Sequence, residues 1–141
     1  MYYSDSDANS TIEVWDEDIV NLTFQVIGCA MKVRNVLGNG YQEVIYQRAL
    51  AIELEACMIS FEREKEQEVY YLDSLVGVRR ADLIVNEELV VELKAVIRLE
   101  DVHLAQAKNY TVAYGFANGL LINFGSNRLE FKRVFNQHLN P

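Results

Sequence analysis

The chain has 141 residues, half of them hydrophobic, with seven glycines and one proline. This composition fits a single domain with a real core, over residues 16–141, and does not favour a second domain. Acidic residues number 21 against 13 Lys and Arg, and the net charge of -8 argues against tight binding of a polyanion over the whole surface. Any nucleic acid site must therefore be local.

The sequence predicts a soluble, cytoplasmic protein without membrane contact. Charges interrupt the apolar stretches before the ~20 residues needed to cross a bilayer, and no basic region followed by an apolar run opens the chain. Cys29 and Cys57 lie in apolar, helix-like segments without metal-ligand spacing. We expect both to be buried free thiols in a reducing compartment.

The N-terminal part predicts an arm followed by two helices. Residues 1–15 are polar and acidic and indicate a flexible arm, with Trp15 anchoring it to the first helix. Apolar residues then recur at helical spacing from a start between Asp16 and Thr23 to the break at residues 38–40. They are Ile19, Leu22, Val26, Ile27, Ala30, Val33 and Leu37. A second helix, about 41 to 57, completes a helical hairpin.

The second helix has two candidate apolar stripes. One stripe is Ile45, Ala49, Ile52 and Ala56, and beside it lie Tyr46, Leu50 and Leu54. Glu43 shares helical spacing with the second stripe, so a carboxylate begins a row that is otherwise core-facing. Either it is a further group of a metal site, or it is a first-turn acid favoured by the helix dipole.

The rest of the chain predicts strands and one more helix. Three segments, about 60–72, 76–85 and 89–97, alternate with period two and predict an antiparallel meander with turns at 73–74 and 86–88. Asp101 caps a third helix that Gly115 ends, and residues 120–125 and 129–135 predict two last strands. The expected order is α-α-β-β-β-α-β-β, an α/β fold.

The hairpin RRADLIVNEELVVELKA carries the chemistry. If residues 86–88 form a three-residue loop, Val85 pairs with Leu89, and Asp82 then lies across from Glu92. Lys94 shares the face of Glu92 because side chains alternate along a strand. Two carboxylates and an ammonium group thus converge among apolar neighbours.

Two interpretations of this convergence stay open. Two like carboxylates in an apolar pair of strands need compensation, which Mg²⁺, or Mn²⁺ in its place, would provide. Asp82 and Glu92 would then hold the metal, and Lys94 would assist a water that attacks a phosphodiester. The simpler alternative is a cross-strand ion pair of either acid with Lys94 or Arg80 on a solvated face.

The third helix adds polar groups to the expected cleft. His103, Gln106 and Tyr110 share one face of that helix, where they would contact phosphate or base. Arg80 is a further candidate for substrate binding. Taken alone, His103 is more typical of a surface or capping histidine than of a substrate-binding one.

Five segments in order resemble the GxxExxY proteins, a branch of the PD-(D/E)xK nuclease superfamily. They are residues 37–46, with Gly40, Glu43 and Tyr46 of the naming motif, then 79–85, 90–96, 102–110 and 120–125. The resemblance implies a restriction-endonuclease-like core, a mixed sheet flanked by helices. It also implies that Asp82 and Glu92 are the acidic pair, Lys94 the catalytic lysine, and Glu43 and Gln106 accessory site residues.

Two functions compete at this stage. The first is a Mg²⁺-dependent nuclease, with DNA as the expected substrate, and the complete set of Asp82, Glu92 and Lys94 favours it. The second is a catalytically silent module with the same fold that binds nucleic acid or a protein partner, and the acidic charge balance favours that. A homodimer would double the contact surface. An acidic inhibitor that mimics DNA rests on net charge alone.

Overall fold

The computed structural model describes residues 17–139, so the expected arm at residues 1–15 and its anchor Trp15 lie outside the described residues. The described elements, in chain order, are α2 (Glu17–Leu37), α3 (Glu43–Ala56), β1 (Phe61–Arg63), β2 (Glu66–Tyr71), β3 (Ser74–Arg80), β4 (Leu83–Val85), β5 (Leu89–Lys94), α4 (Asp101–Tyr114), β6 (Asn118–Asn123) and β7 (Glu130–Phe135). None of the helices among these residues is both long and apolar enough to span a membrane.

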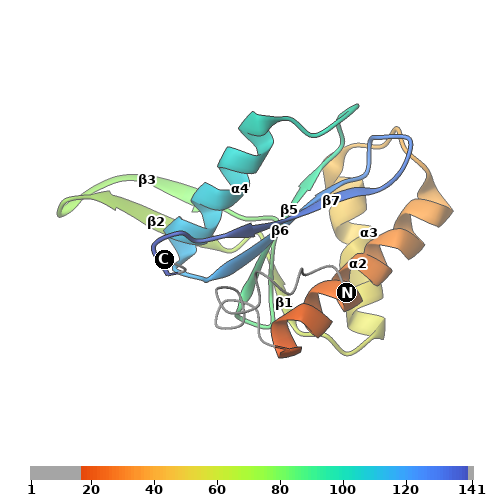
Figure 1. The fold of residues 1–141 in the computed structure, drawn as a ribbon, viewed down its shortest axis with the longest axis horizontal. Helices are drawn as coiled ribbons and strands as arrows, with labels where there is room; N and C mark the ends of the chain where they lie inside the picture. Colours follow the sequence, from red (N-terminus) through yellow and green to blue (C-terminus); the bar gives the residue numbers. More distant parts are fainter. Residues whose placement is uncertain (1–16, 140–141) are drawn as a thin grey trace, which may run out of the picture.

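A five-stranded mixed sheet forms the centre, with strand order β1-β4-β5-β6-β7. The pair β5/β6 is parallel and every other pair in this sheet is antiparallel. Helix α4 connects the two parallel strands across one face of the sheet, while α2 and α3 pack together on the other face (Figure 1). The expected α/β fold, a mixed sheet flanked by helices, is confirmed.

The two faces of the sheet bury different sets of side chains. The face toward α2 and α3 holds the main core, which includes Leu83, Val85, Val91, Leu93 and Ile122. The opposite face packs against α4 through smaller clusters around Ile84, Val90, Leu121 and Val134. Because both faces are covered, β4, β5 and β6 are almost continuously buried, as expected of central strands.

The three-stranded meander proves to be divided. The expected segments 60–72 and 76–85 each break in two, at residues 64–65 and 81–82, so β1 and β4 join the main sheet while β2 and β3 form a separate hairpin. The break after β1 coincides with a φ of 53° at Glu64. Strands β2 and β3 project from the body as an arm (Figure 1). Its turn is at residues 72–73, one residue earlier than expected.

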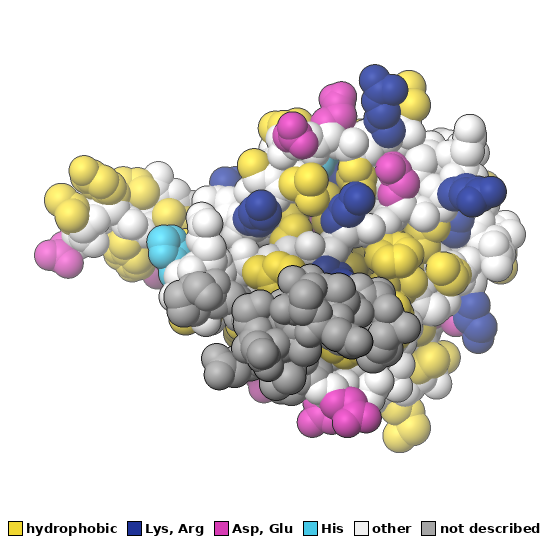
Figure 2. All heavy atoms as spheres, in the orientation of Figure 1, with side chains coloured by type: hydrophobic (Ala, Val, Ile, Leu, Met, Phe, Trp, Pro, Cys, Tyr) yellow, Lys and Arg dark blue, Asp and Glu magenta, His cyan; other side chains and the backbone are white. Residues whose placement is uncertain are grey.

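The tip of the arm is apolar and exposed. Hydrophobic side chains gather there in Figure 2, and the residues concerned are Tyr70, Tyr71, Leu72, Leu75, Val76 and Val78. Alternation with period two could not reveal this departure, because a strand shows the same alternation in a sheet and in a solvated ribbon.

Two expectations about the helices are corrected, one about the buried face of α3 and one about the N-cap of α4. In α3 the buried stripe is Tyr46, Leu50 and Leu54, whereas Ile45 and Ile52 are exposed. The stripe that Glu43 begins is therefore the one that faces the core, although Glu43 itself, at the start of α3, is exposed. The cap of α4 is Glu100 rather than Asp101, and His103 accepts a hydrogen bond from its backbone N–H at 2.9 Å, completing a capping box.

The cysteines are only partly as expected. Both are free, but Cys29 alone is buried, and Cys57 is exposed because α3 ends at Ala56, before it reaches that position. The two sulfur atoms are 3.9 Å apart. Burial is the main cause that raises the pKa of the Cys29 thiol to about 11, so this thiol is not a reactive thiolate.

Candidate active site

The site lies at the part of β5 that extends beyond the end of the neighbouring strand β4. Strand β4 pairs with β5 only as far as Val91, so Glu92, Leu93 and Lys94 are paired with β6 alone. None of the described strands pairs with the other edge of β5 at these residues, so backbone N–H groups along it lack a strand partner. Buried backbone groups need partners, and acidic side chains supply them.

Asp82 occupies the first of these positions. The backbone N–H of Leu93 donates to Asp82 Oδ2 over 2.8 Å, and the N–H of Asp82 donates to Glu92 Oε1 over 2.9 Å. The expected loop at residues 86–88 and the pairing of Val85 with Leu89 are both present. That register brings Asp82 beside Glu92, as the hairpin predicted.

Glu43, at the start of α3, lies farther along the same edge of β5, near Ala95. Its carboxylate lies close enough to the backbone N–H of Ala95, two residues beyond Leu93, for that group to lower its pKa. Burial raises the pKa of Glu43, and the nearby charge of Lys94 opposes that rise while Asp82 adds to it. Glu43, Asp82 and Lys94 therefore act on one another although α3 and β5 are far apart in the sequence.

The loop before Glu43 is fixed by Tyr46. Its hydroxyl donates to the carbonyl of Gly38 over 2.6 Å and accepts from the N–H of Tyr41 at 3.3 Å. Its ring stacks on Phe124, with centroids 4.6 Å apart. Gly40 has a φ of +114°, a conformation that favours glycine. These contacts hold the start of α3, and with it Glu43, against the sheet.

Glu92 is the most strongly perturbed acid of the group. It is 7% exposed, and burial together with the charge of Asp82 raises its pKa to about 8. Burial also raises the pKa of Asp82, although hydrogen bonds from Leu93 and Gln47 oppose that rise. Lys94 lowers the pKa of both acids. The ammonium group of Lys94 therefore offsets only part of the cost of burying two carboxyl groups together.

The simple ion-pair alternative does not describe this geometry. Among residues 17–139, no ion pair within 4.0 Å joins Lys94 to Asp82 or Glu92. Arg80 lies in the exposed arm, where its guanidinium pairs with Glu66 at 2.6 Å. The acids are largely buried rather than placed on a solvated face.

Gln47 is a site residue that sequence reasoning missed. It lies one helical turn after Glu43, and its Nε2 donates to Asp82 Oδ1 over 2.9 Å. A polar residue four positions after Glu43, beside the buried stripe of α3, is the signal that could have revealed it. Asp82 thus receives one hydrogen bond on each carboxylate oxygen.

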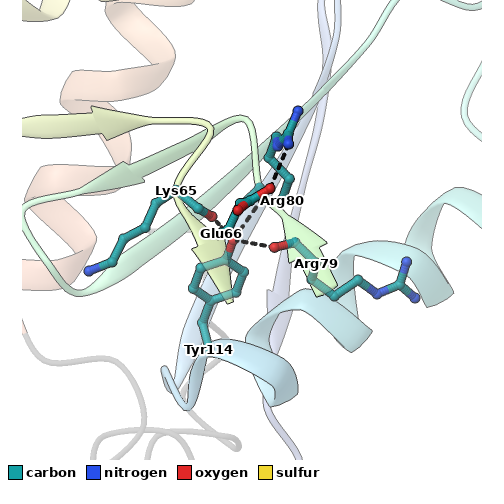
Figure 3. A network of polar contacts seen from close by, with 6 residues as sticks. Lys65, Glu66, Arg79, Arg80 and Tyr114 are labelled. Atoms are coloured by element: carbon teal, nitrogen blue, oxygen red, sulfur yellow. Dashed lines mark hydrogen bonds and ion pairs between the residues drawn. The ribbon is translucent and has the colours of Figure 1, made fainter. Parts of the chain in front are cut away.

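Tyr114 fastens the base of the arm beside the site. Its hydroxyl accepts a hydrogen bond from the N–H of Ala81 at 2.9 Å and contacts the carbonyl oxygens of Lys65 and Arg79 (Figure 3). Ala81 immediately precedes Asp82. This contact therefore fixes the chain where it turns from the arm into β4.

Removing the Tyr114 hydroxyl is expected to destabilise the fold. Tyr114→Phe leaves the buried N–H of Ala81 without an acceptor, which should lower the free energy of unfolding by about 1–3 kcal/mol. Urea denaturation measures the loss. Tyr110→Phe is the matched control, because no hydrogen bond of the Tyr110 hydroxyl is found in the described structure. An equal loss in both variants would contradict this role.

The three polar residues expected on α4 have different surroundings. Arg79 lies over the ring of Tyr110, with its guanidinium carbon 5.2 Å from the centroid, and the acids of the site raise the pKa of Tyr110 together with burial, the larger cause. His103 caps α4 and also lowers the pKa of Glu43. Gln106 is exposed.

A hollow of about 650 Å³ opens directly beyond the end of β5. It is lined by Ala95, Val96, Ile97, Arg98, Glu100 and His103. Asn123 holds this segment by hydrogen bonds of 3.0 Å to both the N–H and the carbonyl of Val96. Gly125 approaches it so closely that a Cβ would lie 2.5 Å from the Val96 backbone. The backbone of Val96, which lines the hollow two residues after Lys94, is therefore held in one position.

The acids are paired rather than clustered in threes. Within the described range, no three His, Cys, Asp or Glu side chains form a group that could hold a metal ion. Asp82 is close enough to Glu43 and to Glu92 to raise the pKa of each. The three carboxylates are nevertheless not near enough to one another to bind one metal ion together as they stand.

Without metal, the stability of the protein should fall as pH rises from about 4.5 to about 8. In this window the unfolded chain has lost the proton of Glu92 while the folded chain retains it, so the raised pKa of Glu92 makes ionisation work against folding. We expect a loss on the order of a few kcal/mol. Urea melts at a series of pH values in EDTA measure it, and stability that stays level or rises across this window would contradict the burial of Glu92.

Comparison with known proteins gives a family and a fold. The family model described as "PD-(D/E)XK nuclease superfamily" matches residues 20–134. The solved structure titled "Crystal structure of SSO0001" is similar, with a TM-score of 0.54 and 20% sequence identity over 66% of this chain. The alignment covers 50% of that longer chain, and at this identity it shows the fold alone. No match was found among curated proteins.

Proposed function

Because the chain belongs to the PD-(D/E)XK nuclease superfamily, we propose that it hydrolyses phosphodiester bonds of nucleic acid, with DNA as the substrate. In this proposal Asp82 and Glu92 hold a divalent metal ion and Lys94 assists the attacking water. Membership of the GxxExxY branch, through Gly40, Glu43 and Tyr46, stays a prediction.

The burial of Asp82 and Glu92 against each other is the observation that carries the proposal. A structural role would not require two adjacent acids whose pKa values are both raised beside a lysine that forms no close ion pair with any residue in the described range. Strongly perturbed groups of this kind are typical of sites that bind or react. A divalent cation would remove the repulsion that Lys94 only partly offsets.

The chemistry of these side chains fits Mg²⁺. Both acids offer carboxylate oxygens, the hard ligands that Mg²⁺ prefers, and Mg²⁺ commonly uses one or two carboxylates while water and phosphate oxygens complete its shell. A pair of acids therefore suffices, and Mn²⁺ would be accepted by the same oxygens. Glu43, whose pKa responds to the charges of Lys94 and Asp82, would border the shell as a third acid.

Each residue has a separate task in hydrolysis. When bound, the metal polarises the phosphate and lowers the pKa of a water. The ammonium group of Lys94 orients the attacking water and stabilises the negative charge that develops on the phosphate. Asp82, fixed by hydrogen bonds on both oxygens, keeps a constant orientation. Gln106 is exposed on α4 and would serve as an accessory group.

Substrate contacts outside the acids would be few. Arg98 and His103 line the hollow that begins beside Lys94. Tyr110, with Arg79 over its ring, lies close enough to Glu92 and Asp82 for both to raise its pKa. Arg80 would reach substrate only by leaving Glu66. Since the net charge is -8, binding would depend strongly on these local groups and on the metal.

A cleavage assay on a panel of substrates tests the proposal. Purified protein is incubated with linear, circular and single-stranded DNA and with RNA, in Mg²⁺, in Mn²⁺ or in EDTA. We expect cleavage of DNA in either metal and none in EDTA. Cleavage of circular DNA would identify endonuclease action, and cleavage of RNA alone would overturn the choice of substrate.

The acidic charge balance favours one alternative, a catalytically silent module that binds nucleic acid or a protein partner. The same assay separates the two functions, because a silent module would shift the mobility of a substrate without cutting it in any metal. A homodimer would supply more contact surface to either function, and light scattering of the purified protein measures its mass.

A further inference from the structure

Gln47 is a buried polar residue that contacts Asp82 and takes no direct part in the proposed hydrolysis. It is 2% exposed. Its Nε2 donates to Asp82 Oδ1 over 2.9 Å, and its Oε1 is buried without a hydrogen-bond donor among the described residues. A buried amide that satisfies only one of its two ends is costly, so its presence requires a reason.

The surroundings of Gln47 do not require an amide for packing. The other buried residues of α3 include Tyr46, Leu50 and Leu54, and an apolar side chain of similar length would fill the space of Gln47 without an unsatisfied oxygen. The amide nitrogen faces Asp82 because the reverse orientation would place two acceptors together. The contact with Asp82 is thus the feature that an apolar residue could not reproduce.

Gln47 completes the fixation of one carboxylate plane. The N–H of Leu93 holds Asp82 Oδ2, and the amide of Gln47 holds Oδ1. The first donor comes from the sheet and the second from α3, so the carboxylate is held from two separate elements. With either donor removed, the carboxylate could rotate about its Cβ–Cγ bond.

We propose that Gln47 is a positioning residue, which fixes the Asp82 carboxylate for a divalent cation and accepts a hydrogen bond from a site water at its Oε1. This inference rests on the proposed function, which makes Asp82 a metal-binding group. It accounts for both ends of the amide, since the nitrogen orients the carboxylate of Asp82 and the oxygen offers an acceptor to a site water.

The test compares Gln47→Met with Leu54→Met. The first removes the amide at nearly constant length, and the second introduces the same residue at a buried apolar position of α3 outside the site. Calorimetry with Mg²⁺ gives the affinity, and cleavage kinetics give kcat and KM. Gln47→Met should weaken Mg²⁺ binding by roughly 10-fold to 100-fold, the usual effect of losing a group that orients a metal ligand. It should also lower kcat without raising KM. Leu54→Met should leave the Mg²⁺ affinity, kcat and KM at their wild-type values.

A purely structural role for Gln47 gives a different result. Both variants would then shift the melting temperature while Mg²⁺ affinity and kcat stayed at the wild-type values, and this outcome overturns the proposal. The wild-type measurements separate the two hypotheses, because an active wild type with an unaffected Gln47→Met variant contradicts the role of Gln47 alone.

If the wild type neither binds Mg²⁺ nor cuts any substrate, the proposed function fails, and NMR then decides on the contact itself. The side-chain amide protons of Gln47 should exchange slowly with solvent in the wild type and rapidly in Asp82→Ala, with exposed Gln106 as the reference for fast exchange. Fast exchange of the Gln47 amide in the wild type would overturn the positioning role whether or not the protein is a nuclease.

Discussion

Glu92→Gln is expected to make the metal-free protein more stable at pH 8 and to abolish both metal binding and cleavage. Glutamine resembles the protonated acid that the folded state prefers, since burial and Asp82 raise the pKa of Glu92 to about 8. The variant should therefore escape a cost on the order of a few kcal/mol that the wild type bears when Glu92 ionises. It also loses a charged ligand, so Mg²⁺ should no longer bind.

Urea melts in EDTA and calorimetry with Mg²⁺ measure the two effects. Glu87→Gln is the matched control, because the same change is made at an exposed position in the turn of the same hairpin. Calorimetry also detects the proton on Glu92. Mg²⁺ binding to the wild type at pH 7 should release this proton to the buffer, so the measured heat of binding should differ between buffers of different ionisation enthalpy. A metal-free Glu92→Gln protein that is less stable than the wild type would contradict the crowding of the two acids.

Lys94→Ala is expected to lower cleavage by roughly 10²-fold or more, the scale of a lost acid-base or electrostatic group. In Mg²⁺ the fold should change little, because removing a positive charge beside a cation relieves repulsion. Without metal the loss of Lys94 leaves Asp82 and Glu92 uncompensated, so stability should fall at pH 8 and recover when Mg²⁺ is added.

Melting temperatures in EDTA and in Mg²⁺, together with cleavage rates, separate these effects. Lys132→Ala, which removes an exposed lysine from β7, controls for the change in net charge. A Lys94→Ala protein that is equally unstable with and without Mg²⁺ would mean that Lys94 has a structural role.

The local part of the site could be predicted from the sequence because it is a hairpin. A three-residue loop at 86–88 fixes the pairing of Val85 with Leu89, and everything up to Asp82 and Glu92 follows by counting. The same reasoning places Lys94 on the face of Glu92. No information beyond neighbouring residues is needed for this step.

The long-range part could not be predicted in the same way. Nothing in the alternation of residues 60–85 distinguishes strands that stay in the sheet from strands that leave it, so the arm of β2 and β3 was missed. Gln47 meets Asp82 only because α3 crosses the open edge of β5, a tertiary arrangement. Ile45 and Ile52 show the same limit, since helical spacing offered two apolar stripes and only packing selects the one that is buried.

The most direct test of a metal-dependent nuclease site at Asp82, Glu92 and Lys94 is a time course of DNA cleavage by wild-type and Lys94→Ala proteins purified side by side. The wild type should cut in Mg²⁺ and not in EDTA, and Lys94→Ala should be slower by roughly 10²-fold or more. No cleavage by the wild type in any divalent metal, or equal rates for the two proteins, would contradict the account.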